Sequence, residues 1–438
     1  MERPVGKKQR GWGALGLLSA LALSGFSVAA QTANEAPMVP GGESMAAENA
    51  DLSVIWKAMQ SADAPALVKL YQEASDPIVH VWAAMALERV HFNLDAASAD
   101  ARLCEQSLID TRPAVALSCG QFRSGNLQLA GRPAEAQAVE RELIERFRNH
   151  RVDRQLASMQ SYLDRSANLP PLSYDVPSGD VTLPLKDTAS VPTIEARAND
   201  HAFNLMLDSG ANGLVLGIED ARRYGVKPLD GEGKVNGWLS QGVPTKQGLL
   251  DTLQFGGITL HNVPVTIVPD PIALFGSNLM APLGTLRFSS KALLIYGKDS
   301  ETPACDTPML AGSGLWGNGL RVLPQLLVND NPQSVMLDTG ASRYLLGTRA
   351  ALDEVTTLHR EKTSVRDIGG SHHFANAQSA KVKLTIAGQP FDILFEIYTD
   401  STNIRHPITL GAGALRDMDF LLDYRHQHMC FLLHPNLR

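Results

Sequence analysis

The sequence is poor in cysteine, has only a modest excess of negative charge and contains no long apolar run after its first thirty residues. Its four cysteines lack the close double spacing of a zinc site. The formal net charge of −7 fits ordinary solubility and gives no sign of binding to nucleic acid or to an anionic membrane surface. With 438 residues, 44% of them hydrophobic and 19% charged, the composition is globular and the length predicts two or three domains.

The first thirty residues have the composition of a signal peptide. Basic residues at 7–10 precede an uncharged apolar stretch at 13–26, and small side chains at 28–30 suit cleavage by signal peptidase. The apolar stretch is short for a membrane span, and an uncleaved anchor is the alternative. The segment 1–30 therefore predicts an exported protein, periplasmic in preference to secreted.

The cysteines are expected to form two disulfides, one in each region of an exported chain. Cys104 and Cys119 lie 15 positions apart (119 − 104), while Cys305 and Cys430 bracket the last part of the sequence. Buried free thiols are the alternative reading of all four side chains.

A helical region is expected before the middle of the chain. Residues 31–50 are small and polar and predict a disordered leader, whereas apolar residues recur at helical spacing over 51–167. The segment that starts at Gly131-Arg132-Pro133 resembles a tetratricopeptide-type helical hairpin. This module could bind a protein partner or brace the domain that follows, and the segment 31–167 could be retained or removed as a propeptide.

From residue 168 onward the pattern changes to β-strands. Short β-branched runs such as VTLPL, VPVTIV and AKVKLTI alternate with Gly- and Pro-rich turns. The arrangement occurs twice, which predicts one β lobe over 168–300 and a second over 301–438, with the junction at 301–319.

Each half contains one copy of the same short motif. LMLDSGANGLVLG occupies 205–217 and VMLDTGASRYLLG occupies 335–347, so Asp208 and Asp338 are 130 positions apart (338 − 208). A single copy would most simply be a turn capped by an Asp side chain. Apolar residues on both sides of both copies instead predict buried aspartates, and a buried carboxyl group requires a partner.

The residues beside each aspartate suit a pair of facing loops. Gly210 and Gly340 allow the backbones to approach closely, and the hydroxyl groups of Ser209 and Thr339 can lock the loops together. Two carboxyl groups that share one proton can activate water against a peptide bond.

With these motifs, residues 175–438 resemble the pepsin–retropepsin class of aspartic peptidases, in a single-chain version with two lobes. The resemblance implies a bilobal all-β acid-protease barrel fold after the all-α module, with Asp208 and Asp338 as catalytic residues. It also implies an aspartic-type endopeptidase that acts on polypeptides and needs no cofactor or metal. Ser209 stands where retropepsins usually have Thr.

The family also has a glycine late in each lobe, packed behind the aspartate loop. Gly411 is the candidate in the second lobe and Gly284 in the first, with Phe275-Gly276 as a rival. Gly284 is preferred because the distances from glycine to Tyr296 and to Tyr424 are 12 and 13 positions (296 − 284 and 424 − 411).

The family further places a mobile hairpin, or flap, between the aspartate and the late glycine. VNGWLSQGVPTKQG at 235–248 and DIGGSHHFANAQ at 367–378 occupy the corresponding positions. Trp238, Gly369 and Gly370 are the candidate flap residues.

Two histidines follow the second glycine pair. We interpret His372 and His373 as exposed tip residues, because no cysteine or acidic cluster nearby in the sequence completes a metal site. No metal is therefore predicted.

The residue after each loop glycine bears on the pH of activity. Pepsins usually have a hydroxyl residue there, whereas Ala211 and Ala341 stand here, as in retropepsins. The resemblance therefore implies activity nearer neutral pH, weakly acidic at most. Two alternatives to an active peptidase remain: a catalytically silent peptide-binding module, and a helical scaffold with a tethered peptidase fold.

Overall fold

The computed structural model describes most of the chain beyond its N-terminal segment. The predicted signal peptide and all but the last residue of the predicted leader lie outside the described residues, which are 50–150, 152–166, 169–186, 190–352, 359–399 and 406–435. No helix within these ranges has the length and apolar character needed to cross a membrane.

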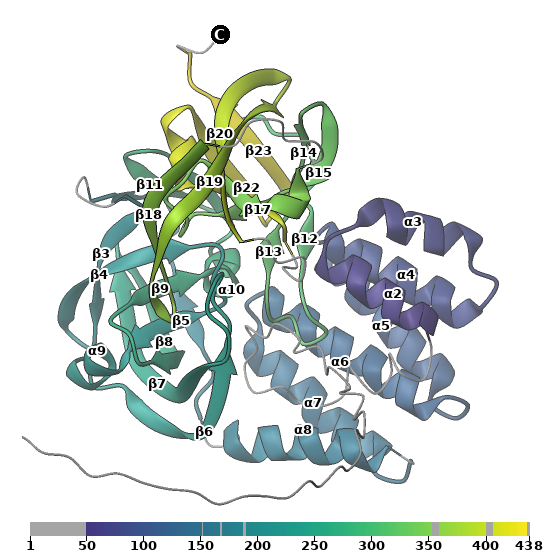
Figure 1. Cartoon of the computed structure of the whole chain (residues 1–438). Coiled ribbons are helices and arrows are strands. Elements are labelled where there is room, and N and C mark those ends of the chain that lie inside the picture. The colour runs from purple at the N-terminus through teal and green to yellow at the C-terminus, as the bar shows by residue number, and fades with distance from the viewer. Residues whose placement is uncertain are drawn as a thin grey trace, which may run out of the picture. The chain divides into compact units, whose positions relative to one another are not determined.

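The first part of the described chain is helical (Figure 1). Consecutive helices pack on one another as hairpins. The tetratricopeptide assignment goes further than this observation and stays a prediction. The helices are α2 (Ala50–Gln60), α3 (Ala64–Glu73), α4 (Pro77–Val90), α5 (Leu94–Leu108), α6 (Pro113–Leu129), α7 (Pro133–Phe147) and α8 (Asp153–Ser166).

Local sequence explains where these helices begin. Pro77, Pro113 and Pro133 each open a helix, where the missing N–H costs nothing and the fixed φ suits the first turn. Asp76 caps α4 by accepting a hydrogen bond from the Ile78 amide at 2.8 Å.

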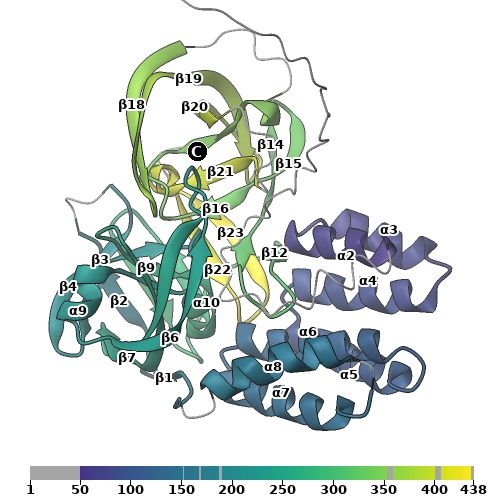
Figure 2. The ribbon, with the colours of Figure 1, turned by 60° about the horizontal axis from the view of Figure 1, so that its bottom comes forward.

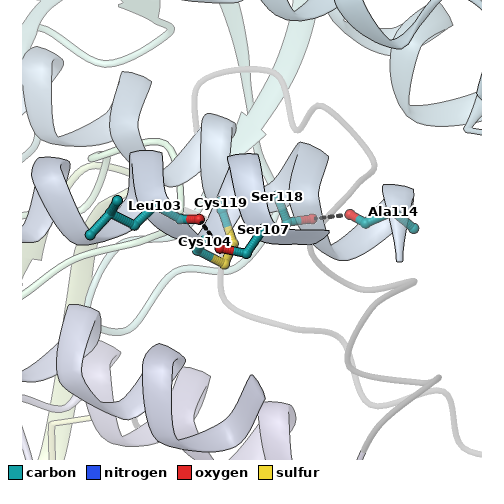
Figure 3. Close-up of a disulfide and its surroundings, with 6 residues drawn as sticks. All are labelled: Leu103, Cys104, Ser107, Ala114, Ser118 and Cys119. Carbon is teal, nitrogen blue, oxygen red and sulfur yellow. Dashed lines mark hydrogen bonds between the residues drawn. A yellow bond between two sulfur atoms is a disulfide. The ribbon is translucent and has the colours of Figure 1, made fainter. Parts of the chain in front are cut away.

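Both predicted disulfides form, one in each region. Cys104 and Cys119 join α5 to α6 (Figure 3). Cys305 and Cys430 join the segment after the first lobe to β23 near the end of the described chain. The described residues include no free cysteine.

The first lobe is a sheet with the strand order β1-β8-β5-β9-β4-β3-β7-β6. Strand β7 pairs with both β3 and β8, which closes the middle of this sheet into a barrel. The strands are β1 (Ser173–Asp175), β3 (Thr193–Ala198), β4 (His201–Asp208), β5 (Leu214–Gly217), β6 (Lys227–Val235), β7 (Val243–Phe255), β8 (Ile258–Val268) and β9 (Ala273–Gly276), with the short helices α9 (Ile218–Arg223), α10 (Ser277–Met280) and η1 (Ala281–Leu283).

The second lobe repeats much of this plan in the order β15-β14-β19-β20-β17-β21-β16, with β18 paired to β19. Figure 2 shows the long β18–β19 hairpin. Its strands are β14 (Gln325–Val328), β15 (Asn331–Ser334), β16 (Met336–Asp338), β17 (Leu345–Thr348), β18 (His359–Asp367), β19 (Gly370–Ile386), β20 (Gln389–Thr399) and β21 (Ile408–Gly411), with the short helices η2 (Arg349–Ala351) and η3 (Ala412–Arg416).

A third sheet takes strands from both halves of the chain. Its order is β2-β11-β10-β22-β23, and β10 pairs with β22 at its centre, so the two lobes share one hydrogen-bonded layer. The strands are β2 (Val181–Pro184), β10 (Thr285–Phe288), β11 (Ala292–Tyr296), β22 (Met418–Asp423) and β23 (His428–Leu433). The predicted fold class is confirmed: an all-α module precedes two all-β, barrel-like lobes, each decorated with short helical turns.

The helices and the lobes are linked by a short connector, which we define as β12 (Ala311–Gly312), β13 (Arg321–Val322) and the chain between them. Arg89 of α4 is fully buried and donates hydrogen bonds to the connector carbonyls of Gly314 at 2.8 Å and Leu315 at 3.1 Å. The same guanidinium binds Asn126 at 2.6 Å and lies 3.5 Å from the ring centroid of Phe122.

Replacing Arg89 by methionine is expected to lower the free energy of unfolding by about 3–5 kcal/mol, because buried carbonyl groups would lose their donor. Denaturant unfolding monitored by tryptophan fluorescence measures this loss. The exposed Arg102 of the neighbouring helix provides a matched control, and Arg102→Met should change stability by less than about 0.5 kcal/mol. Equal effects of the two substitutions would show that the hydrogen bonds from Arg89 to the connector do not stabilise the fold.

Candidate active site

Both predicted catalytic aspartates lie at the ends of central strands. Asp208 ends β4 and pairs with Gly276 of β9 in parallel register, and Asp338 ends β16 and pairs with Gly411 of β21 in the same way. The two lobes therefore present their aspartates from equivalent positions.

Each aspartate is held by the backbone of its own turn. The amides of Gly210 and Ala211 donate to Oδ1 of Asp208 at 2.8 and 3.0 Å. The Gly340 amide donates to Oδ1 of Asp338 at 2.9 Å. Such bonds fix one carboxylate oxygen and leave the other available.

The two loops are locked together through their hydroxyl groups, as the sequence predicted. The Ser209 amide donates to Oγ1 of Thr339, and the Thr339 amide donates to Oγ of Ser209, both at 3.0 Å. Each hydroxyl donates in turn to the opposite lobe: Ser209 to the Leu337 carbonyl at 2.9 Å and Thr339 to the Leu207 carbonyl at 2.6 Å. All four bonds are buried, so they resist competition from water.

This lock brings the carboxyl groups together. A β-carbon placed on Gly210 would lie 2.6 Å from Cγ of Asp338, and one placed on Gly340 would lie 2.4 Å from Cγ of Asp208. Each glycine thus lies against the opposite carboxyl group, and Asp208 and Asp338 are in hydrogen-bonding contact. Only glycine leaves room for this approach.

The electrostatics of Asp208 follow from its half-buried position beside a second carboxyl group. Burial, the charge of Asp338 and the hydrogen bond with it raise the pKa of the Asp208 carboxyl well above its ordinary value. Arg321 and the Gly210 amide oppose this rise. Carboxyl groups in such contact cannot both ionise cheaply, and the raised pKa of Asp208 favours the state in which that carboxyl keeps its proton.

The late glycine of the first lobe is Gly276, and the prediction of Gly284 is wrong. Gly276 pairs with Asp208 as Gly411 pairs with Asp338. Both glycines pack against the backbone of their aspartate loop, because an added β-carbon would lie 2.3 Å from the carbonyl carbon of Asn212 or 2.2 Å from the carbonyl oxygen of Arg343.

The two tyrosines whose spacing favours Gly284 lie on strands that are not equivalent. Tyr296 ends β11, the outer strand of its hairpin, whereas Tyr424 directly follows β22, the inner strand. Gly284 has another role: it adopts a φ of +91° in the turn before β10.

The predicted flap segments form hairpin tips that contact each other. Asp367, from the second lobe, accepts hydrogen bonds from the amides of Leu239 and Ser240 at 2.8 Å and from the Ser240 hydroxyl at 2.7 Å. Burial raises the pKa of Asp367, but the hydrogen bonds from Ser240, Gly369 and Leu239 outweigh it and hold that pKa below its ordinary value. The contact therefore keeps its charged acceptor at weakly acidic and neutral pH and loses it only on strong acidification.

Apolar side chains cross between the lobes on either side of this contact. Trp238 and Leu239 of the first lobe pack in a cluster with Ala341, which follows the Asp338 turn. Ile368 of the second lobe packs in a cluster with Ala211, which follows the Asp208 turn. The two tips thus share apolar clusters with the residues that follow the aspartate turns.

The predicted flap residues divide by role. Trp238 contacts Tyr398 edge to face, with ring centroids 5.6 Å apart. Gly369 gives room to Ser240, whose Oγ would lie 2.2 Å from an added β-carbon, and Gly370 takes a φ of +116°. His373 is exposed, as expected.

His372 differs from the expectation of an exposed residue. It is half-buried, and its Nε2 lies 2.9 Å from Oγ of Ser240 and 3.2 Å from Oδ1 of Asp367. One ring nitrogen faces both partners, so this cluster lacks the relay geometry of a Ser-His-Asp hydrolase, in which the two nitrogens face different partners. Among the described residues, no group of three or more His, Cys, Asp and Glu side chains could hold a metal ion.

Removing the Asp367 carboxylate is expected to loosen the flap contact. Asp367→Ala should speed hydrogen exchange of the Leu239 and Ser240 amides about tenfold, because each loses a charged acceptor. Mass spectrometry of peptides covering 236–242 measures the rate. Asp392→Ala, on the exposed face of β20, is the control, and unchanged exchange in the Asp367 variant would show that the contact does not hold the tips.

Arg321 and the connector residues were not predicted as part of the site. The connector amide of Gly319 donates to Oδ1 of Asn212, which follows Ala211, at 2.6 Å. The sequence carries one signal for Arg321, a charged residue flanked by leucine and valine, and burial of such a side chain demands partners.

Sequence comparison connects the first lobe to a known family. Residues 194–280 match the aspartyl protease family. The matched segment of the chain runs from β3 to α10 and includes Asp208, the first flap and Gly276. The aspartyl protease match stops before β10 and the second lobe. No curated protein matches the chain.

Two solved aspartic proteases are similar to this chain at low identity. An aspartic proteinase from Irpex lacteus is 11% identical, with a TM-score of 0.41, over 58% of this chain and 98% of that one. A retropepsin-like aspartic protease from Rickettsia conorii is 19% identical, with a TM-score of 0.21, over 29% of this chain and 94% of that one.

Proposed function

We propose that the chain is an aspartic endopeptidase in which Asp208 and Asp338 hold one proton between them and activate a water molecule. The observation that carries the proposal is the reciprocal locking of two aspartate turns, which places two half-buried carboxyl groups in contact. A binding module has no need of such a pair, since holding two half-buried carboxyl groups in contact is unfavourable unless their chemistry is used.

The proposed reaction is direct hydrolysis of a peptide bond. The charged carboxylate removes a proton from the water as its oxygen attacks the carbonyl carbon, and the protonated carboxyl donates its proton to the carbonyl oxygen. The resulting tetrahedral diol then collapses, with proton transfer to the leaving amine. The loop amides keep both carboxyl groups in place throughout.

Polypeptide is the proposed substrate, bound between the aspartate pair and the two flap tips. The apolar side chains of Trp238, Leu239 and Ile368 share clusters with Ala211 and Ala341, which follow the aspartate turns, and would favour apolar side chains near the cleaved bond. The helical region over 51–167 is proposed as a tetratricopeptide-like module, and the lobes as the domains 168–300 and 301–438.

We also propose that the protein is exported, to the periplasm in preference to the medium. The N-terminal segment has the composition of a signal peptide. The two disulfides are typical of proteins from oxidising compartments.

Incubation of the purified mature protein with an unfolded protein, such as a casein, tests the proposal. We expect fragments to form at weakly acidic to neutral pH and pepstatin to suppress them. Asp330→Asn serves as a control, because Asp330 is exposed and pairs only with Lys383 among the described residues. Peptide binding without cleavage would favour the catalytically silent binding module. A cleavage rate that keeps increasing below about pH 3 would contradict the expectation of activity nearer neutral pH.

A further inference from the structure

Arg321 is a buried charged side chain beside the proposed catalytic loop. Arg321 lies on β13 of the connector and is only 7% exposed. Nη1 donates to the carbonyl oxygens of Leu320 at 2.6 Å and, more weakly, of Ala211 at 3.5 Å. Ala211 is also the residue whose amide holds Oδ1 of Asp208, so the guanidinium is one peptide unit away from that contact.

The position of Arg321 is fixed from the side of the first lobe. Oγ of Ser277 lies within hydrogen-bonding distance of the same two carbonyl oxygens, at 2.9 Å from Ala211 and 2.6 Å from Leu320. The Asn278 amide group binds the connector at the Gly317 carbonyl, 2.6 Å away. These contacts join the connector to the loop that carries Asp208.

The connector is also fixed from the side of the helices. Arg89 binds its carbonyl groups, and Leu315 of the connector lies in one apolar cluster with helical residues and with Met336, two positions before Asp338. An added β-carbon on Gly125 of α6 would lie 2.2 Å from the Leu315 carbonyl oxygen, which shows how closely the helix and the connector approach.

We propose that Arg321 is a positioning residue of the aspartate pair: it orients the Asp208 turn through the Ala211 carbonyl and keeps a fixed positive charge beside it, and the helical module holds it there through the connector. The inference rests on the proposed peptidase function. It makes the helical module a permanent part of the enzyme, since removal of 51–167 would release the connector.

The charge of Arg321 has a defined consequence for the pair. The charged groups that act on Asp208 are Asp338 and Arg321. A nearby cation stabilises the pair with one negative charge relative to the fully protonated pair, which lowers the first pKa of the pair. It also stabilises the pair with two negative charges relative to the singly charged pair, which lowers the second pKa. Removing it should therefore shift both limbs of the pH profile of kcat/KM to higher pH.

The test compares Arg321→Met and Arg321→Lys with the full-length wild-type enzyme on one peptide substrate. Arg321→Met should lower kcat about tenfold and move both limbs upward by about one pH unit. Arg321→Lys retains the charge and should keep the limbs within about 0.3 unit of wild type. Arg222→Met removes an exposed cation from the first lobe, which carries Asp208, and should leave kcat and the pH limbs unchanged.

Thermal unfolding first shows whether each variant is folded. The role of Arg321 would be overturned if folded Arg321→Met had the same pH profile of kcat/KM as the wild type. It would also be overturned if the pH profiles of the Met and Lys variants shifted equally. Either result would leave the peptidase proposal intact. If Arg321→Met does not fold, the Lys variant decides alone: kcat/KM near wild type with unshifted limbs supports the inference, and displaced limbs overturn it. Absence of cleavage by the wild type would instead reject the proposed function itself.

Discussion

Replacing either Asp208 or Asp338 by asparagine is expected to reduce kcat/KM for peptide hydrolysis about 1,000-fold. Asparagine has nearly the same shape but neither accepts nor donates the proton that water activation requires. Either substitution leaves one carboxyl group beside a neutral amide, so the pair can no longer share a proton. Rates with a fluorogenic peptide across the pH range of activity measure the loss.

The fold of these variants should be preserved, because Ser209 and Thr339 rather than the carboxyl groups lock the two turns. Thermal unfolding and retained binding of an uncleaved peptide check this point. The exposed control Asp330→Asn should cleave at the wild-type rate. A single-site aspartate variant that keeps more than a tenth of wild-type kcat/KM would argue against the proposed roles.

Gly210→Ala is expected to lower kcat about 100-fold, because its methyl group would lie 2.6 Å from Cγ of Asp338. Neither loop can move away without breaking the buried hydroxyl bonds, so the carboxyl groups must separate. A displacement of about 1 Å in catalytic geometry is enough for a loss of this size. Steady-state kinetics with the same peptide measures the effect.

Gly213 offers a matched control within the same loop. An added β-carbon there meets no atom within 4 Å, so Gly213→Ala should keep kcat within about twofold of wild type. Equal losses in the two variants would mean that any added side chain disturbs this loop, and that the close approach of Gly210 to Asp338 is not what matters.

The aspartate pair could be predicted from sequence because each turn is encoded locally. An apolar strand, Asp, a hydroxyl residue and Gly occur together twice, and the structure places the four loop residues Ser209, Gly210, Thr339 and Gly340 in reciprocal contact. The helical and β regions were also predictable, since Pro-opened helical periods and short β-branched runs are local patterns.

The late glycine shows where counting positions fails. The first lobe inserts α10 and η1 between β9 and β10, whereas η3 alone separates β21 from β22. Equal distances to a tyrosine therefore selected Gly284, although strand pairing selects Gly276. The register of a parallel strand pair depends on tertiary packing, which spacing along the chain does not record.

The flap contact and Arg321 could not be derived from the sequence because their partners are distant. Asp367 lies 127 positions from Ser240, and Arg321 lies 110 positions from Ala211. Nothing in either local segment specifies the other. Only the folded chain brings a charged residue next to backbone groups that need a partner.

The most direct test of the central claim, that two carboxyl groups act as one unit, is kcat/KM of the variant in which both Asp208 and Asp338 are asparagine. We expect this double variant to be no slower than either single variant, because the first substitution already removes the shared proton. Losses that multiply, so that the double variant falls about another 1,000-fold, would contradict it and show two groups that contribute independently.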